Sequence, residues 1–215
     1  QIGDRMGYAV VDWADPAKKW VFHGISDPKA KIGGKFTHGL GVGDVNGDGR
    51  QDILFRFGWW EQPASLDGDP QWVGHPFNFA GRGGAQMYVY DIDGDGDNDV
   101  VSSYNAHGYG LFWFEQVKKD GKLTFEKHRI MGEFPRQSRY GVAIGNLHAI
   151  DLIDMDGDGL KDIVTGNRYW AHGGRDKADK GQAPVYWFQL VRSAAGDGAH
   201  YVPHEIDPHS GVGTQ

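Results

Sequence analysis

The apolar residues of this chain fall into short runs that are separated by polar segments rich in glycine and aspartate. Runs at residues 40–43, 87–90 and 150–153 each precede a nine-residue polar segment, and a second apolar run follows it. Short runs of β-branched and aromatic residues between turn-forming segments are typical of β-strands. Helical periodicity is weak along the chain, so the pattern predicts an all-β protein with many turns.

Two further runs complete each repeat. The third run begins with an aromatic pair or triplet at Trp59, Trp113 and Trp187. The fourth run carries an aromatic-x-x-His pattern, which ends at His23, His75, His128 and His204. Four strands in each repeat, with repeats that begin 47 and then 63 residues apart, are typical of the blades of a β-propeller. We expect these four histidines to be structural residues that pack at the blade edge.

The polar segments at 44–52, 91–99 and 154–162 share the pattern D-x-[DN]-G-D-G-x-x-D. Oxygen-rich ligands at alternate positions, with glycine at the sharp turn, suit Ca²⁺. An EF-hand would place Glu at position 12, whereas these loops have Phe55, Ser102 and Thr165 there and strands on both sides. Hairpin turns without a metal would explain one copy, but three clusters of unneutralised carboxylates would be repulsive.

The sequence therefore predicts three Ca²⁺ sites, with side-chain ligands at positions 1, 3, 5 and 9 and a backbone carbonyl at position 7. The predicted metal ligands are Asp44, Asn46, Asp48, Arg50 and Asp52; Asp91, Asp93, Asp95, Asp97 and Asp99; and Asp154, Asp156, Asp158, Leu160 and Asp162.

These loops and their flanking strands resemble the FG-GAP/VCBS repeats of calcium-binding β-propellers, and the likeness covers nearly the whole chain. The segments Gly58-Trp59-Trp60-Glu61-Gln62-Pro63 and Asn105-Ala106-His107-Gly108-Tyr109-Gly110-Leu111 resemble repeats of secreted bacterial carbohydrate-associated proteins and of aldos-2-ulose dehydratase-type propeller domains. The resemblance implies a propeller of seven blades, calcium in its loops and a carbohydrate ligand.

We expect a single propeller segment over residues 1–215. Its blades are predicted at 1–35 in part, 36–79, 80–131 and 132–207, with the start of another at 208–215. About three and a half blades cannot close a ring that normally needs four to eight. The remaining blades of the same propeller, or a partner chain that completes it, are therefore expected partners, and open sheet edges are expected at both ends.

Charge and hydropathy narrow the classes of partner. The formal net charge of −7 argues against a nucleic-acid surface, and three bound Ca²⁺ ions would nearly cancel it. No stretch has the apolar length of a membrane span, and the first residues show no signal-peptide pattern. Because loops of this type need millimolar calcium, we expect a secreted, periplasmic or cell-surface location with a signal outside this sequence.

Strand alternation predicts a second face, opposite the calcium loops, where the remaining unusual residues gather. His38 and His148 each lie six residues before a calcium loop, and long connections at 131–147 and 167–184 open on the same face. The candidate catalytic residues are His107, Tyr109, His148, Arg168 and His172, with His107 or His172 as base and Tyr109 as acid. The candidate substrate-binding residues are His38, Arg139, Tyr169, Trp170 and Arg175.

Histidine, tyrosine and arginine together suit an acidic sugar, since Arg pairs with a carboxylate and His or Tyr can transfer a proton. The sequence is thus consistent with a saccharide lyase or sugar dehydratase. The alternative is a non-catalytic module for glycan binding, adhesion or protein interaction, with Trp170 and the tyrosines as contacts. Three of the histidines can also hold Zn²⁺, and a purely structural role for each residue, as a strand cap or solvated charge, remains open.

Overall fold

The computed structural model describes residues 5–27, 37–170, 172–179, 181–193 and 198–212. Within this part of the chain the regular structure is β, apart from one short 3₁₀ helix, η1. The elements are β1 (Gly7–Val10), β2 (Val21–Gly24), β3 (Leu40–Gly43), β4 (Asp52–Phe55), β5 (Gly58–Glu61), β6 (Val73–Pro76), β7 (Gln86–Tyr90), β8 (Asp99–Ser103), β9 (Leu111–Lys119), β10 (Lys122–Met131), η1 (Pro135–Gln137), β11 (Ile150–Ile153), β12 (Asp162–Gly166), β13 (Val185–Arg192) and β14 (Ala199–Asp207).

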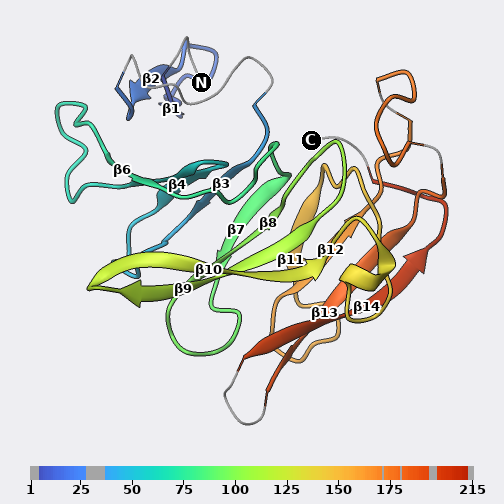
Figure 1. Cartoon of the computed structure of the whole chain (residues 1–215). Helices are drawn as coiled ribbons and strands as arrows, with labels where there is room; N and C mark the ends of the chain where they lie inside the picture. Colours follow the sequence, from blue (N-terminus) through green and yellow to red (C-terminus); the bar gives the residue numbers. More distant parts are fainter. Residues whose placement is uncertain (1–4, 28–36, 171, 180, 194–197, 213–215) are drawn as a thin grey trace.

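The strands form three four-stranded antiparallel units, β3–β6, β7–β10 and β11–β14, in which chain neighbours are also sheet neighbours. A separate hairpin of β1 and β2 precedes them. Figure 1 shows the units side by side, each twisted like a blade. The prediction of an all-β, partial propeller is confirmed. Residues 1–4 and 28–35 of the predicted partial blade, and residues 213–215 at the other end, lie outside the described residues.

The first strands of neighbouring units approach one another closely. β3 and β7 pair in parallel, Leu40 with Gln86 and Gly41 with Met87, so the first two units form one eight-stranded sheet. A Cβ on Gly41 would lie 2.3 Å from the Met87 carbonyl oxygen, and glycine is therefore required for this approach. The Tyr88 hydroxyl donates to the Ile150 carbonyl at 3.0 Å and connects β7 to β11.

Apolar cores fill the spaces between successive units. One cluster joins the first and second units and includes Leu54, Trp59 and Phe114; another joins the second and third and includes Trp113 and Phe188. Among the described residues, no helix is long and apolar enough to cross a membrane.

A stacked tryptophan–histidine pair recurs between the third and fourth strands of every unit. The two rings lie directly across from one another, with centroids 4.1, 4.3 and 4.4 Å apart; the pairs are Trp59 with His75, Trp113 with His128 and Trp187 with His204. A carboxylate or amide two residues after each tryptophan also contacts the histidine; these residues are Glu61, Glu115 and Gln189. This packing gives the histidines of these three units the structural role expected for them, and His23 stacks on Tyr8 of β1 at 5.0 Å in the same way.

The last aspartate of each acidic loop is buried and holds the loop to the third strand. Asp52, Asp99 and Asp162 are 0%, 1% and 0% exposed. In the second unit, the Asp99 carboxylate accepts from the backbone N–H of Ile92 at 3.0 Å and from that of Gln116 at 2.8 Å. The other two units repeat both hydrogen bonds, with Val45 and Gln62 as donors to Asp52, and Met155 and Leu190 as donors to Asp162.

Asp99→Ala should therefore destabilise the chain even without metal. It leaves two backbone N–H groups without an acceptor in a buried place, which we expect to lower the free energy of unfolding by about 2 to 4 kcal/mol. Denaturant unfolding in excess chelator measures this. Asp97→Ala, a change at a partly exposed carboxylate of the same loop, is the control and should stay within about 0.5 kcal/mol. Equal stability of the two variants would contradict the structural role.

Candidate functional site

The three acidic loops fold in the same way at one end of the units. The glycines at positions 4 and 6 all have positive φ, as in Gly94 (87°) and Gly96 (92°), where a Cβ would strain the backbone. The carboxylate at position 5 accepts the backbone N–H of position 7 in every loop, at 2.8 to 2.9 Å. The three loops therefore share one backbone turn.

The second and third loops gather carboxylates closely enough to hold a metal ion. Asp91, Asp93 and Asp99 offer oxygens within 4.8 Å of one another, and Asp154, Asp156 and Asp162 do the same. Burial, together with the charges of Asp93 and Asp95, raises the pKa of Asp99 to about 7. An all-oxygen, carboxylate-rich donor set fits a hard cation such as Ca²⁺ or Mg²⁺, which would relieve this repulsion.

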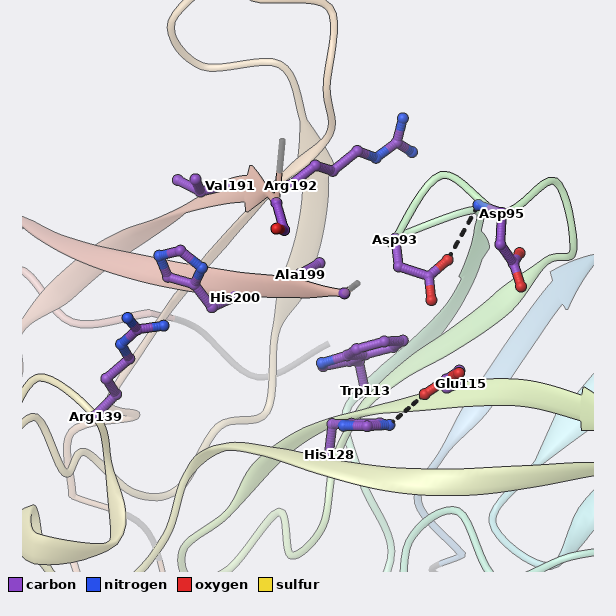
Figure 2. Close-up of a pocket in the computed structure, with 12 residues that line it drawn as sticks. Asp93, Asp95, Trp113, Glu115, His128, Arg139, Val191, Arg192, Ala199 and His200 are labelled. Carbon is purple, nitrogen blue, oxygen red and sulfur yellow. Dashed lines mark hydrogen bonds and ion pairs between the residues drawn. The ribbon is translucent and has the colours of Figure 1, made fainter. Parts of the chain in front are cut away.

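A cleft of about 870 Å³ opens beside the second loop, between the second and third units. Figure 2 shows its two walls: Asp93, Asp95 and Glu115 on one, Arg139 and His200 on the other. The structure thus places Arg139, predicted to bind substrate with the histidines, in this cleft.

The opposite end of the units brings three of the predicted histidines together. His38 lies two residues before β3, His148 two before β11, and His107 in the turn between β8 and β9. Their ring centroids lie 4.8 to 4.9 Å apart, and the Nε2 atoms of His38 and His107 are 3.0 Å apart. His38 and His148 are 110 positions apart in the chain. They meet because each lies two residues before the first strand of its unit, at the same end of the units.

Asp176 organises this group of histidines. Its Oδ2 accepts from Nδ1 of His107 and from Nδ1 of His172, each at 3.0 Å, and from the Arg168 guanidinium. Desolvation raises the pKa of Asp176, but these hydrogen bonds outweigh it and lower that pKa to about 2. The side chain therefore stays a carboxylate near neutral pH.

Arg168 is buried at 4% exposure and links Asp176 to His148. It donates to His148 Nε2 at 2.6 Å, and Asp179 lies 4.0 Å from its guanidinium. Burial, and then the charge of Arg168, lower the pKa of His148 to about 4. His148 is thus neutral near pH 7, with its proton on Nδ1 because Nε2 accepts.

The histidines can also hold a transition metal ion. Nitrogens of His38, His107 and His148 lie within 4.8 Å of one another. Tetrahedral Zn²⁺ with bonds of about 2.0 to 2.1 Å places ligand nitrogens about 3.3 Å apart, close to the 3.0 Å between His38 and His107. His148 can join through Nε2 only if the metal replaces Arg168 at that nitrogen. A second set, His107, His172 and Asp176, is already occupied by mutual hydrogen bonds.

Of the remaining predicted residues in the described part of the chain, only Arg175 lines a hollow with one of these histidines. Arg175 lines a hollow of about 380 Å³ with His107. Tyr169 and Trp170 are exposed at 66% and 58%. Tyr109, the predicted acid, lines a different hollow with Gly145 and Asn167. The structure does not bring Tyr109 to the histidines.

Sequence reasoning missed Arg82 and gave no role to Asp176. Arg82 stands in the glycine-rich connection before β7 and lines the hollow that contains His107. Asp176 lies four residues after His172, a spacing that could have drawn attention to it.

Comparison with known proteins matches part of the chain. Residues 91–165 match the family model described as an FG-GAP-like repeat, a stretch that contains the second loop, most of the third unit's first two strands, and His107 and His148. No curated protein matches the chain. This supports the FG-GAP resemblance over residues 91–165.

Asp176→Asn should destabilise the chain through Arg168. The change removes the charge that compensates a buried guanidinium, with Asp179 as the remaining carboxylate, and we expect a loss of about 2 to 4 kcal/mol. Lys177→Ala removes the neighbouring exposed pair with Glu133 and should cost less than about 0.5 kcal/mol. Urea unfolding of the three proteins measures the difference; similar losses for both variants would argue against this role of Asp176.

Proposed function

We propose that this chain is part of a calcium-binding β-propeller that further blades complete. We also propose that the end of the units where His38, His107 and His148 meet, the histidine face, binds an acidic saccharide and carries out β-elimination on it. The FG-GAP-like repeat and the strand order support a propeller interaction module in general. The specific proposal rests on one observation: His107, held by Asp176, lines a hollow together with Arg82 and Arg175.

The arginines are suited to the substrate's carboxylate. Guanidinium groups form bidentate pairs with carboxylates and are not deprotonated near neutral pH. Lys177 lines the same hollow but is paired with Glu133 at 2.7 Å. Arg82 and Arg175 would therefore orient a uronic acid with its reactive carbon toward His107.

His107 has the geometry of a general base. Asp176 accepts from Nδ1, which leaves the lone pair on Nε2, and a carboxylate partner favours the protonated imidazole that forms. In the proposed reaction Nε2 takes the proton next to the carboxylate, the carbon–hydrogen electron pair becomes a double bond, and the carbon–oxygen bond to the neighbouring substituent breaks. The leaving oxygen takes this proton back from the His107 imidazolium, because burial, and then the charges of His107 and Arg168, lower the pKa of His38 and leave its ring neutral.

The proposal includes two kinds of metal site, one in the acidic loops and one among the histidines. Ca²⁺ in the acidic loops would fix the scaffold, and its millimolar requirement supports a secreted or periplasmic location. A transition metal held by His38, His107 and His148 is a second candidate, favoured by the spacing of their nitrogens. It would supply Lewis-acid stabilisation of the carboxylate, and Asp176 would then orient His107 as a ligand.

The non-catalytic alternative is a glycan-binding module. Two large aromatic side chains, Tyr169 and Trp170, are exposed on the connection that also carries His172 and Asp176. Exposed aromatic rings of this kind suit the apolar faces of sugars.

Loss of His107 tests the catalytic proposal. With a uronic-acid polymer as substrate, formation of an unsaturated product is followed by ultraviolet absorbance, and His107→Ala should lower the rate by about 10² to 10⁴. His209→Ala, at an exposed histidine far along the chain, is the control and should leave the rate unchanged. A wild-type protein that binds the polymer without turnover, and loses binding with Trp170→Ala, would support the glycan-binding module instead.

Metal analysis distinguishes a histidine site that holds a transition metal from one that acts by proton transfer alone. If a transition metal is bound, mass spectrometry of the native protein should find one ion per chain that is lost in His38→Ala and retained in His172→Ala. Full elimination activity after removal of that metal would favour proton transfer by the His107 and Asp176 pair.

Calcium binding is tested by stability. Millimolar Ca²⁺ should raise the unfolding temperature relative to chelator, because an ion that binds only the folded loops stabilises them. Asp95→Ala and Asp158→Ala should each abolish one binding event in calorimetric titration. An unfolding temperature that does not respond to calcium would contradict the proposal.

A further inference from the structure

The seventh position of the acidic loop differs among the three copies. It is Arg50 in the first loop, Asp97 in the second and Leu160 in the third. The predicted ligand at this position is the backbone carbonyl, so the side chain is free to take another role.

The Arg50 side chain folds back over its own loop. Its guanidinium contacts the carboxylate of Asp48, the central predicted ligand, and its Nε donates to the Gln62 carbonyl at 2.8 Å. The second contact anchors the guanidinium on the segment after β5. Arg50 therefore brings a fixed positive charge to the place where a metal ion would bind Asp48.

The other two loops contain no such charge at position 5. Among the described residues, no lysine or arginine pairs with Asp95 or Asp158. The second loop has two longer contacts with cations, Lys118 with Asp97 at 3.5 Å and Arg192 with Asp91 at 3.7 Å, and Arg192 also donates to backbone carbonyls of that loop. The second and third loops also gather three carboxylates within 4.8 Å, whereas the described residues of the first loop do not form such a group. Asn46 further lowers its negative charge relative to Asp93 and Asp156.

We infer that the first loop carries its own cation, the Arg50 guanidinium, and therefore binds calcium more weakly than the second and third loops. The inference rests on the proposed calcium binding. Calcium affinity in oxygen-ligand loops depends on the number of ligand charges, and here one carboxylate is already neutralised and a positive charge must be displaced. In turn, the first loop keeps its fold without metal, because the guanidinium relieves the repulsion that calcium relieves elsewhere.

A reciprocal exchange at position 7 tests this inference. The full chain is stripped with chelator and titrated with CaCl₂ by calorimetry. We expect two tight binding events and a third about tenfold or more weaker, a difference of roughly 1.4 kcal/mol or more. Arg50→Leu should strengthen the weak event by about tenfold, and Leu160→Arg should weaken one tight event by a similar factor.

Two further variants assign the events to loops. Asp48→Ala should remove the weak event and leave both tight ones, whereas Asp158→Ala should remove a tight one. Amide hydrogen exchange in chelator gives a second readout that needs no metal: residues 44–52 should remain more protected than 91–99 and 154–162, and Arg50→Leu should abolish that difference.

Three equal binding events, or a weak event that Arg50→Leu leaves unchanged while Asn46→Asp strengthens it, would overturn the role of Arg50 and leave calcium binding intact. No calcium uptake by any loop would overturn the proposed calcium binding, and this inference with it.

Discussion

The structure of each unit depends on one buried carboxylate. Asp52, Asp99 and Asp162 each accept two backbone N–H groups, one from the start of the acidic loop and one from the third strand. A buried charge is costly unless it is hydrogen-bonded, so the loop has little freedom to leave the strand. This explains why nine residues with two glycines take the same shape in all three units.

The acidic loops are fixed at one end of the units, and this determines which residues lie together at the opposite end. Because neighbouring strands are antiparallel, the connections into β3 and β11 and the turn after β8 lie opposite the loops, and they carry His38, His148 and His107. Their rings meet only because the first strands of successive units pack closely, as the contact between Gly41 and Met87 shows. The histidine face is thus a property of several units together, and no single repeat could form it.

The repeat made much of this predictable. The loop spacing gave the strands, and the equal distance of His38 and His148 from their loops placed both at one level. Asp176 and Arg82 were harder to predict because they lie in irregular connections, where no strand alternation indicates which side of the chain a residue faces. For the same reason Arg139 and Tyr109 were assigned to the histidines, although the structure places them in a cleft and in a separate hollow.

The loops are also connected to one another through side chains of the next unit. Asn98 of the second loop donates to the Asp44 carbonyl at 2.7 Å, and Arg192 of β13 donates to the Ile92 carbonyl at 2.9 Å. Both acceptors are backbone groups at positions 1 and 2, so these contacts fix the loop entrance, and the Arg192 guanidinium also lies 3.7 Å from the Asp91 carboxylate. Arg50 differs because it binds a carboxylate at position 5. In the proposed calcium loops, the arginine that pairs with the central carboxylate at position 5 is therefore the one that competes with the cation.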